Sequence, residues 1–140
     1  MGSMRGCLLL ILAGALALNA AEPKTVTIEG KLIVRVGSPA FIETSTHQTI
    51  QLDGDAPTRK VLHDERINGM AAQATGHYTS PGKFLVDPQH KRALLVKKDD
   101  KLKMVTYWCE VCGIRAYAPG PCVCCQAETE LDLRDLDDIR

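Results

Sequence analysis

Apolar and polar residues alternate along the chain from residue 25 onward. Between Thr25 and Val36 the apolar residues fall mainly on even positions with mostly polar residues between them, which is typical of a half-buried strand. Gly30 interrupts this stretch and predicts a bulge or a sharp coil, the device by which a small barrel bends a long first strand. The alternation resumes from His47 to Asp53 and predicts a second strand.

The chain between residues 58 and 108 predicts one helix and several further strands. From Thr58 to Met70 the apolar residues recur at roughly helical spacing, and Asn68-Gly69 would end such a turn, so we expect one short helix. Four strand-like pieces follow, at 71–80, 83–86, 93–97 and 102–108. Asp99-Asp100 predicts a hairpin turn between the last two.

Short strands, frequent turns, one brief helix and glycines inside strands favour a mainly β fold. This organisation resembles a small closed or half-closed β barrel of the oligonucleotide/oligosaccharide-binding (OB) type. After Cys125 the chain is acidic, with three spaced leucines, and predicts one edge strand followed by a frayed end.

The first 21 residues have the organisation of a secretory signal peptide. Met4-Arg5 is a charged start, an apolar run extends from Cys7 to Leu18, and the small residues at 19–21 offer a cleavage site. The run is about a dozen residues, shorter than the roughly 20 that a membrane-spanning helix needs. Glu22-Pro23 stands where a lipoprotein anchor requires cysteine. We therefore expect an exported protein, periplasmic or secreted, with no membrane span after signal removal.

The charges of the chain are balanced, with 17 basic and 17 acidic side chains, and loss of Arg5 with the leader changes this by one. A chain without net positive charge has no overall electrostatic field to attract nucleic acid or an anionic membrane, so we expect neither as a partner. A mature chain of about 120 residues suits one compact domain or a small domain with an appended module. An unidentified protein or small molecule remains as the expected partner.

Five of the six cysteines lie between residues 109 and 125. They form two Cys-x2-Cys pairs nine residues apart, Cys109 with Cys112 and Cys122 with Cys125, and Cys124 is an extra thiol inside the second pair. A Cys-x2-Cys turn points both sulfurs to one side, and two facing turns enclose one tetrahedral ion at Zn–S distances of ~2.3 Å. Two such pairs therefore predict a metal site.

The segment YWCEVCGIRAYAPGPCVCCQAETEL resembles the knuckle pair of zinc-ribbon and rubredoxin-like proteins over about 20 residues. The shared features are an aromatic residue before Cys-x2-Cys-Gly and a proline shortly before the second pair. The resemblance implies four metal ligands, Cys109, Cys112, Cys122 and Cys125, with Gly113 as the knuckle glycine. Two features depart from the pattern: the spacer is shorter than the usual 15 to 20 residues, roughly, and Cys124 could substitute for Cys125. Four thiolates suit zinc first, with iron or copper(I) as alternatives.

Two other uses of these thiols stay open. Exported cysteines normally meet an oxidising compartment and form disulfides, although five cysteines leave one unpaired. The sequence WCEVC also has the Trp-Cys start of a thioredoxin site. Gly113, Pro119 and Pro121 argue against that reading, because a thioredoxin motif opens a helix. Metal binding is the first expectation, disulfides the second and a catalytic dithiol the third.

No catalytic constellation is evident in the rest of the sequence, and we expect no enzyme. The hydrolase elbow and the glycine-rich phosphate loop are both missing. His63-Asp64-Glu65 predicts a solvated helical face, because these neighbours point in different directions. The histidines lack ligand spacing and are expected at surface or turn positions: His47, His63, His77 and His90. Three aromatic residues are expected to cap the cysteine hairpin: Tyr107, Trp108 and Tyr117.

Together these features predict four segments: a signal peptide at 1–21, an OB-like barrel at 22–106, a zinc-ribbon-like hairpin at 107–128 and an acidic tail at 129–140. We expect a small exported structural or binding protein that holds a metal, zinc first, on cysteine thiolates. The alternative is an exported thiol-disulfide redox or soft-metal-handling protein that uses the same cysteines, starting from Cys124.

Overall fold

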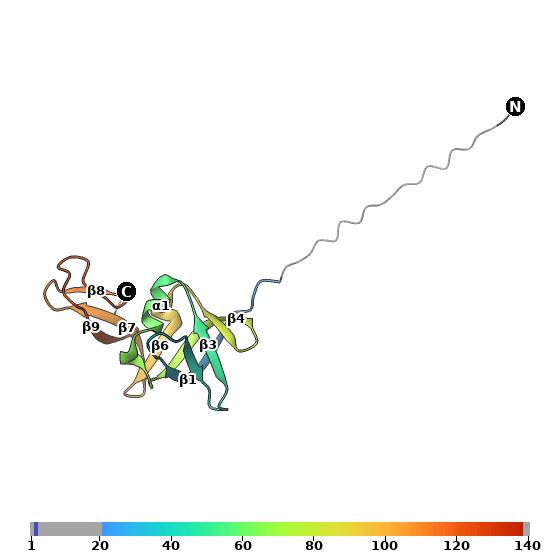
Figure 1. Cartoon of the computed structure of the whole chain (residues 1–140), viewed down its shortest axis with the longest axis horizontal. Helices are drawn as coiled ribbons and strands as arrows, with labels where there is room; N and C mark the ends of the chain where they lie inside the picture. The colour runs from blue at the N-terminus through green and yellow to red at the C-terminus, as the bar shows by residue number, and fades with distance from the viewer. Residues whose placement is uncertain (1, 3–20, 139–140) are drawn as a thin grey trace.

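The computed structural model describes residue 2 and residues 21–138, so the predicted signal peptide at 1–21 lies almost wholly outside the described residues. Five strands form a closed barrel (Figure 1): β1 (Val26–Ile33), β2 (Ala40–Glu43), β3 (Thr49–Asp53), β4 (Ala71–Ser80) and β5 (Lys83–Val86). Their order is β1-β2-β3-β5-β4, and pairing of β4 with β1 closes the ring. The β3–β5 pairing is parallel and the other four are antiparallel. The mainly β, OB-like barrel predicted from the sequence is confirmed.

The glycine inside the first strand allows close contact between two strands. β1 pairs with β4 over its first six residues and with β2 over its last three. A Cβ atom on Gly30 would lie 2.1 Å from the carbonyl oxygen of Glu43, in β2. Any larger residue would therefore push β2 away at the point where β1 passes from one partner to the other.

Three short helical segments accompany the strands: α1 (Ala56–Leu62), the 3-10 helix η1 (Glu65–Ile67) and α2 (His90–Ala93). Asp55 caps the N-terminus of α1, because its carboxylate accepts a hydrogen bond from the Thr58 amide at 3.0 Å. The helix buries Val61 and Leu62 against the barrel. The short helix expected at 58–70 is confirmed. β2 and α2 were not predicted, because four residues are too few to establish either period.

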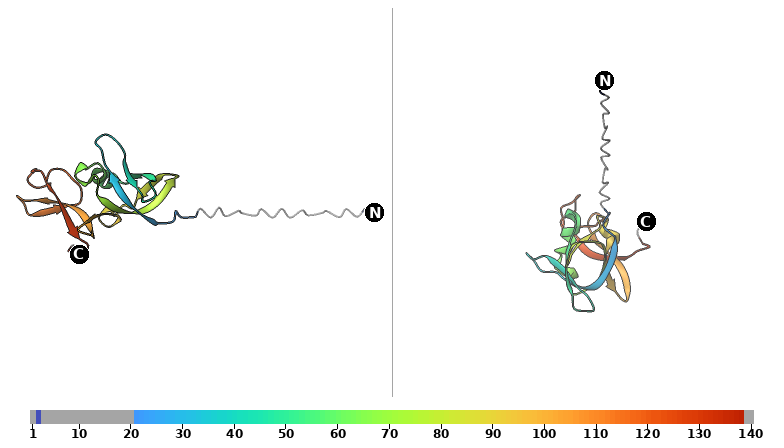
Figure 2. Two further views of the ribbon diagram at one scale, coloured as in Figure 1. Left: turned by 90° about the horizontal axis from the view of Figure 1, so that it is seen from below. Right: turned by 90° about the vertical axis from the view of Figure 1, so that its right-hand side faces the viewer.

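A second group of strands continues the sheet from β4: β6 (Leu94–Lys98), β7 (Lys101–Cys109), β8 (Ile114–Ala116) and β9 (Glu130–Asp135). β6 pairs with β4, β7 pairs with β6, and β8 and β9 both pair with β7. Figure 2 shows β7, β8 and β9 projecting to one side of the barrel. The edge strand expected in the acidic C-terminal segment is β9, which pairs with β7 at six positions.

One hydrophobic core joins the barrel and the second group of strands. It includes Ile42 and Phe84 of the barrel together with Val96, Val105 and Tyr107 of β6 and β7. β7 is therefore anchored in the core through Val105 and Tyr107, and its last residue, Cys109, begins the cysteine hairpin. Within residues 21–138, no helix is long and apolar enough to cross a membrane.

Candidate metal centre

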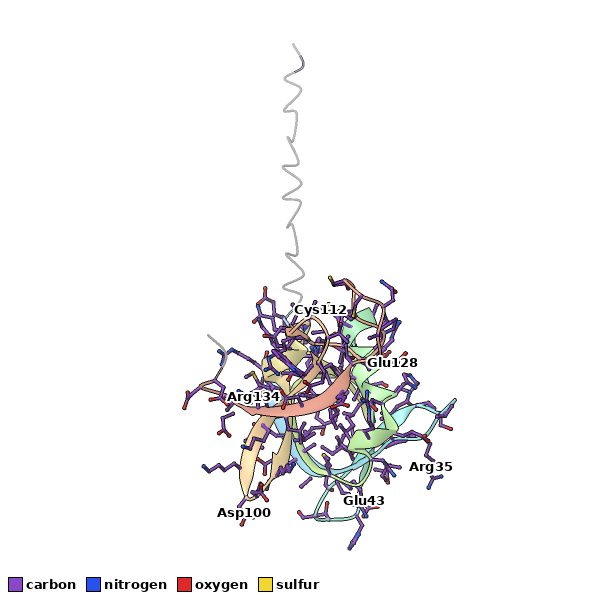
Figure 3. All side chains as sticks on the ribbon, turned by 90° about the vertical axis from the view of Figure 1, so that its left-hand side faces the viewer. Arg35, Glu43, Asp100, Cys112, Glu128 and Arg134 are labelled. Carbon is purple, nitrogen blue, oxygen red and sulfur yellow. The ribbon has the colours of Figure 1, made fainter. Side chains whose placement is uncertain are left out.

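The cysteine hairpin begins where β7 ends. β7 delivers Cys109, a tight turn carries Cys112, β8 follows, and a second turn at 122–126 precedes β9. In Figure 3, Cys112 lies at one end of the second group of strands, and Asp100, the tip of the β6–β7 hairpin, lies at the other. The pairing of β7 with both β8 and β9 sets the two cysteine turns against each other.

Four thiols converge in this hairpin. The sulfur atoms of Cys109, Cys112, Cys122 and Cys125 all lie within 4.8 Å of one another, and those of Cys109 and Cys125 are 3.5 Å apart. A tetrahedral site with Zn–S bonds of ~2.3 Å has sulfurs about 3.8 Å apart along each edge. The group can therefore hold one metal ion with little rearrangement. All five cysteines from 109 to 125 are free thiols in the structure.

The two cysteine turns share one backbone conformation. The Gly113 amide donates to the Cys109 carbonyl at 2.8 Å, and the Gln126 amide donates to the Cys122 carbonyl at 2.9 Å. Gly113 and Gln126, each directly after the second cysteine of its pair, have φ of 63° and 62°. The second turn is therefore built on Cys122 and Cys125. Cys124 corresponds to Val111 of the first turn and is exposed.

Backbone amides point at the first sulfur of each turn. The Cys112 amide donates to Cys109 Sγ and the Cys124 amide donates to Cys122 Sγ, both at 3.4 Å. Such donors stabilise a thiolate over a thiol. At Cys122 the amides of Cys125 and Cys124 lower the pKa to about 7.

Crowding of the thiols acts in the opposite direction. Interaction with the thiols of Cys124 and Cys125 raises the pKa of Cys112 well above its usual range. At Cys109 the Cys112 amide lowers the pKa, but burial and the thiols of Cys125 and Cys122 together outweigh it and leave the pKa raised. Four negative sulfurs cannot share this space without a compensating cation, which a divalent metal ion supplies.

The aromatic residues near the cysteines have different roles from those expected. Tyr107 does not cap the hairpin: it is fully buried in the core. Trp108 lies beside the first turn, since a Cβ on Gly113 would be 3.9 Å from its ring. Tyr117 stacks with Lys91, 5.1 Å from the ring centroid. Only Trp108 is thus placed against a cysteine turn.

A buried carboxylate ties the barrel to the strand that carries Cys109. Asp64 is 8% exposed, so the solvated face expected at 63–65 is wrong for this residue, whereas His63 and Glu65 are exposed as expected. Its carboxylate accepts hydrogen bonds from the Tyr107 hydroxyl at 2.8 Å and from Arg66 Nε at 2.9 Å, and it caps η1 through the Arg66 amide. The only sequence signal for this contact is an aspartate just before a short helical turn.

His90 also differs from the expected surface position. It begins α2, is buried, and its Nε2 atom makes a short hydrogen bond with the carbonyl oxygen of Tyr117, between the two cysteine turns. A second link runs from the other side of the hairpin, where the Thr129 hydroxyl donates to the Gly120 carbonyl at 2.8 Å. Hydrogen bonds therefore hold the hairpin in its middle, at Tyr117, and at its C-terminal end, at Thr129.

Arg115, on β8, holds the three C-terminal strands together below the cysteines. Its Nη1 atom donates to Thr106 Oγ1 of β7 at 2.7 Å and to the Asp132 carboxylate of β9 at 2.6 Å. Its guanidinium lies 4.9 Å from the Trp108 ring centroid. Sequence reasoning missed this cluster because its members come from three separate segments.

A groove of about 920 Å³ lies between the barrel and the β6–β7 hairpin. Its walls carry five acidic and two basic side chains: Glu29, Asp100, Asp135, Asp137, Asp138, Lys97 and Lys101. This excess of acidic groups gives no positive potential that would steer a polyanion into the groove.

Comparisons of this chain with protein-family models, with curated proteins and with solved structures found no match.

Proposed function

We propose that this is an exported zinc-binding protein in which a structural zinc ion, held by Cys109, Cys112, Cys122 and Cys125, folds the C-terminal hairpin onto an OB-like barrel. Zinc is favoured over other cations because four thiolates in a tetrahedral array are its common structural ligand set. The barrel and the hairpin would form one structural or binding unit without catalytic activity of its own.

Sparse burial in the hairpin is the observation that carries this proposal. Between residues 110 and 128, Cys122 is the only fully buried residue. Ordering a residue of backbone costs roughly 1–2 kcal/mol, which a segment without a core cannot recover by apolar burial. Cys122 is 3% exposed, and Cys109, directly before the segment, is 0% exposed. A metal on their sulfurs would replace the missing core, since its binding free energy is folding free energy for the segment.

The residues of the hairpin would act on the zinc in two ways. Amide donors at Cys109 and Cys122 lower the proton affinity of these two sulfurs and hold them in place. Arg115 and Asp132 hold together the strands from which the turns arise, which limits how far the turns can separate when the ion is absent.

Elemental analysis tests the metal assignment directly. We expect the purified chain to contain one zinc ion per molecule, and the Cys124→Val variant to contain the same amount, because valine stands at the equivalent position of the first turn. Zinc should be measured with iron and copper in the same sample. The proposal would be refuted if the chain, purified without reductant, contained no metal, whether its cysteines were free or joined in disulfides.

The export part of the proposal rests on the composition of residues 1–21. We expect the chain expressed in a bacterium to be recovered outside the cytoplasm with its N-terminus near residue 22. N-terminal sequencing of the recovered protein measures this. A matched variant with Leu9→Arg and Leu10→Arg in the apolar run should stay in the cytoplasm uncleaved. Recovery of the unmodified chain with an intact Met1 in the cytoplasm would contradict export.

A further inference from the structure

We infer that the chain forms a symmetric dimer in which β9 pairs antiparallel with β9 of a second copy, so that one sheet runs through both molecules. This dimer goes beyond the proposed zinc function and uses a surface that holds none of the four converging cysteines. Three observations support it: the outer edge of β9 is unpaired, the order of charges along β9 is self-complementary, and one of these charged side chains has a buried donor without a hydrogen-bond partner.

β9 has one edge that no strand of the described chain covers. It pairs with β7 at six consecutive positions without a bulge, and within residues 21–138 no other strand pairs with it. In Figure 3, β9 crosses the near side of the molecule between Glu128 and Arg134. The strand contains no proline or lysine, two residues that commonly protect a sheet edge from further pairing. β9 can therefore accept a further strand.

The outward backbone groups of β9 belong to Leu131 and Leu133. The Thr106 hydroxyl of β7 donates to the Asp132 carbonyl, so the backbone groups of Asp132 point toward β7. Successive residues of a strand direct these groups to opposite edges, which turns those of the two leucines outward. Within the described residues, neither leucine makes a backbone hydrogen bond outside the pairing with β7. A second strand can therefore bind to both of them.

Two charged side chains of β9, Glu130 and Arg134, are poorly partnered within the chain. Glu130 is exposed, and no ion pair within residues 21–138 includes it. The Nε atom of Arg134 is buried without a hydrogen-bond partner, and Asp138 Oδ2 lies 3.6 Å from it. A buried donor without an acceptor is unfavourable, because it has lost its water and gained no bond in exchange. Arg134 therefore lacks a carboxylate at closer range.

One register of β9 with a second copy joins these two charges. With residue 132 on the two-fold axis, Glu130 lies opposite Arg134 of the second copy, and the reverse pair forms on the other side of the axis. Leu131 then lies opposite Leu133 of the second copy, and each such pair exchanges both N–H···O bonds. The charged pairs fall at non-hydrogen-bonded positions, where opposite side chains are closest.

The neighbouring registers are less favourable. Sliding by two residues in one direction places Glu130 opposite Asp132 of the second copy, and like charges directly opposite each other are destabilising. Sliding in the other direction requires the Asp135 carbonyl, which already accepts a hydrogen bond from the Asp138 amide at 3.1 Å. In the favoured register the two Asp132 carboxylates meet at the axis, but each is bound to Arg115 of its own chain at 2.6 Å, which offsets its charge.

The experiment uses the mature chain loaded with zinc, and sedimentation velocity measures its mass over a range of concentrations. We expect the native protein to approach twice the monomer mass as the concentration rises. Glu130→Arg places two arginines opposite each other in each pair, and Arg134→Glu places two glutamates there, so each variant alone should remain a monomer. Lys83→Glu, in β5, makes the same charge change as Arg134→Glu away from this edge and should dimerise like the native protein.

A mixture of the two variants tests the register itself. The Glu130→Arg and Arg134→Glu chains are complementary at both charged pairs, so an equimolar mixture should regain the dimer mass. The zinc content and circular dichroism of each variant should equal those of the native protein, which excludes unfolding as the cause of dissociation. A native chain that stays monomeric, single variants that dimerise alone, or a mixture that stays monomeric would each overturn the inference. The zinc proposal would be unaffected, because it is tested by metal content.

Discussion

Replacing Cys109 by serine is expected to abolish metal binding and unfold the hairpin from about residue 110 to 128 while the barrel stays folded. Cys109 is fully buried and supplies one of four converging sulfurs. Structural zinc contributes apparent free energies of about 10–16 kcal/mol in zinc-finger peptides, so loss of the ion removes the main stabilisation of a segment without its own core. The barrel core belongs largely to β1 through β5 and does not depend on these sulfurs.

Three measurements check this result on the same protein. Elemental analysis should show one zinc per chain falling to none, and limited proteolysis should open new cleavage sites only between residues 110 and 128. Far-ultraviolet circular dichroism should retain most of its strand signal. The matched control is Cys124→Ser, which removes a thiol from the same hairpin and should leave zinc content and proteolysis unchanged. Unchanged zinc stoichiometry in Cys109→Ser would rule out the four-thiolate site.

Replacing Tyr107 by phenylalanine is expected to destabilise the whole fold by about 1.5–3 kcal/mol, the range for a hydrogen bond to a charged group. The substitution leaves the ring in the core but removes the donor to Asp64, whose buried carboxylate is then short of one partner. Burial, followed by the bond to Asp64, raises the pKa of Tyr107 far above its usual range, so the hydroxyl stays a neutral donor.

Denaturant unfolding of the zinc-loaded protein measures this loss. Tyr78→Phe is the matched control, because Tyr78 is 46% exposed. The free energy of unfolding of this variant should differ from that of the native protein by less than about 0.5 kcal/mol. Equal stability of the Tyr107→Phe and native proteins would show that the Asp64 bond contributes nothing to the anchoring of β7.

The same contact has a predictable pH dependence. Burial raises the pKa of Asp64, but hydrogen bonds from Arg66 and Tyr107 outweigh it, so the folded-state pKa lies below the ordinary 3.8. The ionised carboxylate therefore stabilises the fold above that value, and its contribution is lost as pH falls through the lower folded-state pKa. The stability difference between the native chain and Asp64→Asn should thus shrink below about pH 4. Acid release of zinc affects both proteins and cancels in this difference.

Much of the candidate site could be predicted because its signals are local. Both cysteine turns, their ligands and the knuckle glycine lie within 17 residues, from Cys109 to Cys125. The knuckle spacing alone therefore predicted four converging thiols, and the structure brings those four together. Backbone geometry favours Cys125 over Cys124 as the second cysteine of its turn, since the left-handed residue Gln126 follows Cys125 as Gly113 follows Cys112.

The sequence predicts a small barrel, but it does not predict which strands pair or where the shortest elements lie. Alternating apolar residues indicate strands, because a half-buried strand has a period of two residues whatever its partner. The pairing partner of each strand has no such local signal. β4 pairs with β1, 40 to 50 residues earlier in the chain, and its other edge pairs with β5 and β6. Strands or helices of four residues, such as β2 and α2, depend on these long-range contacts and leave no periodic signal.

The sequence alone thus determines the ligand pattern of the cysteine hairpin, because a metal-binding turn needs only a few side chains at short spacing. Its anchoring is decided by the tertiary structure. Asp64 and Tyr107 meet across 43 residues, and His90 reaches Tyr117 across 27. In sequence, Asp64 and His90 look like ordinary surface or turn residues, and the two tyrosines look like caps of the cysteine hairpin. Burial makes them partners, because a polar group removed from water must find another polar group within the fold.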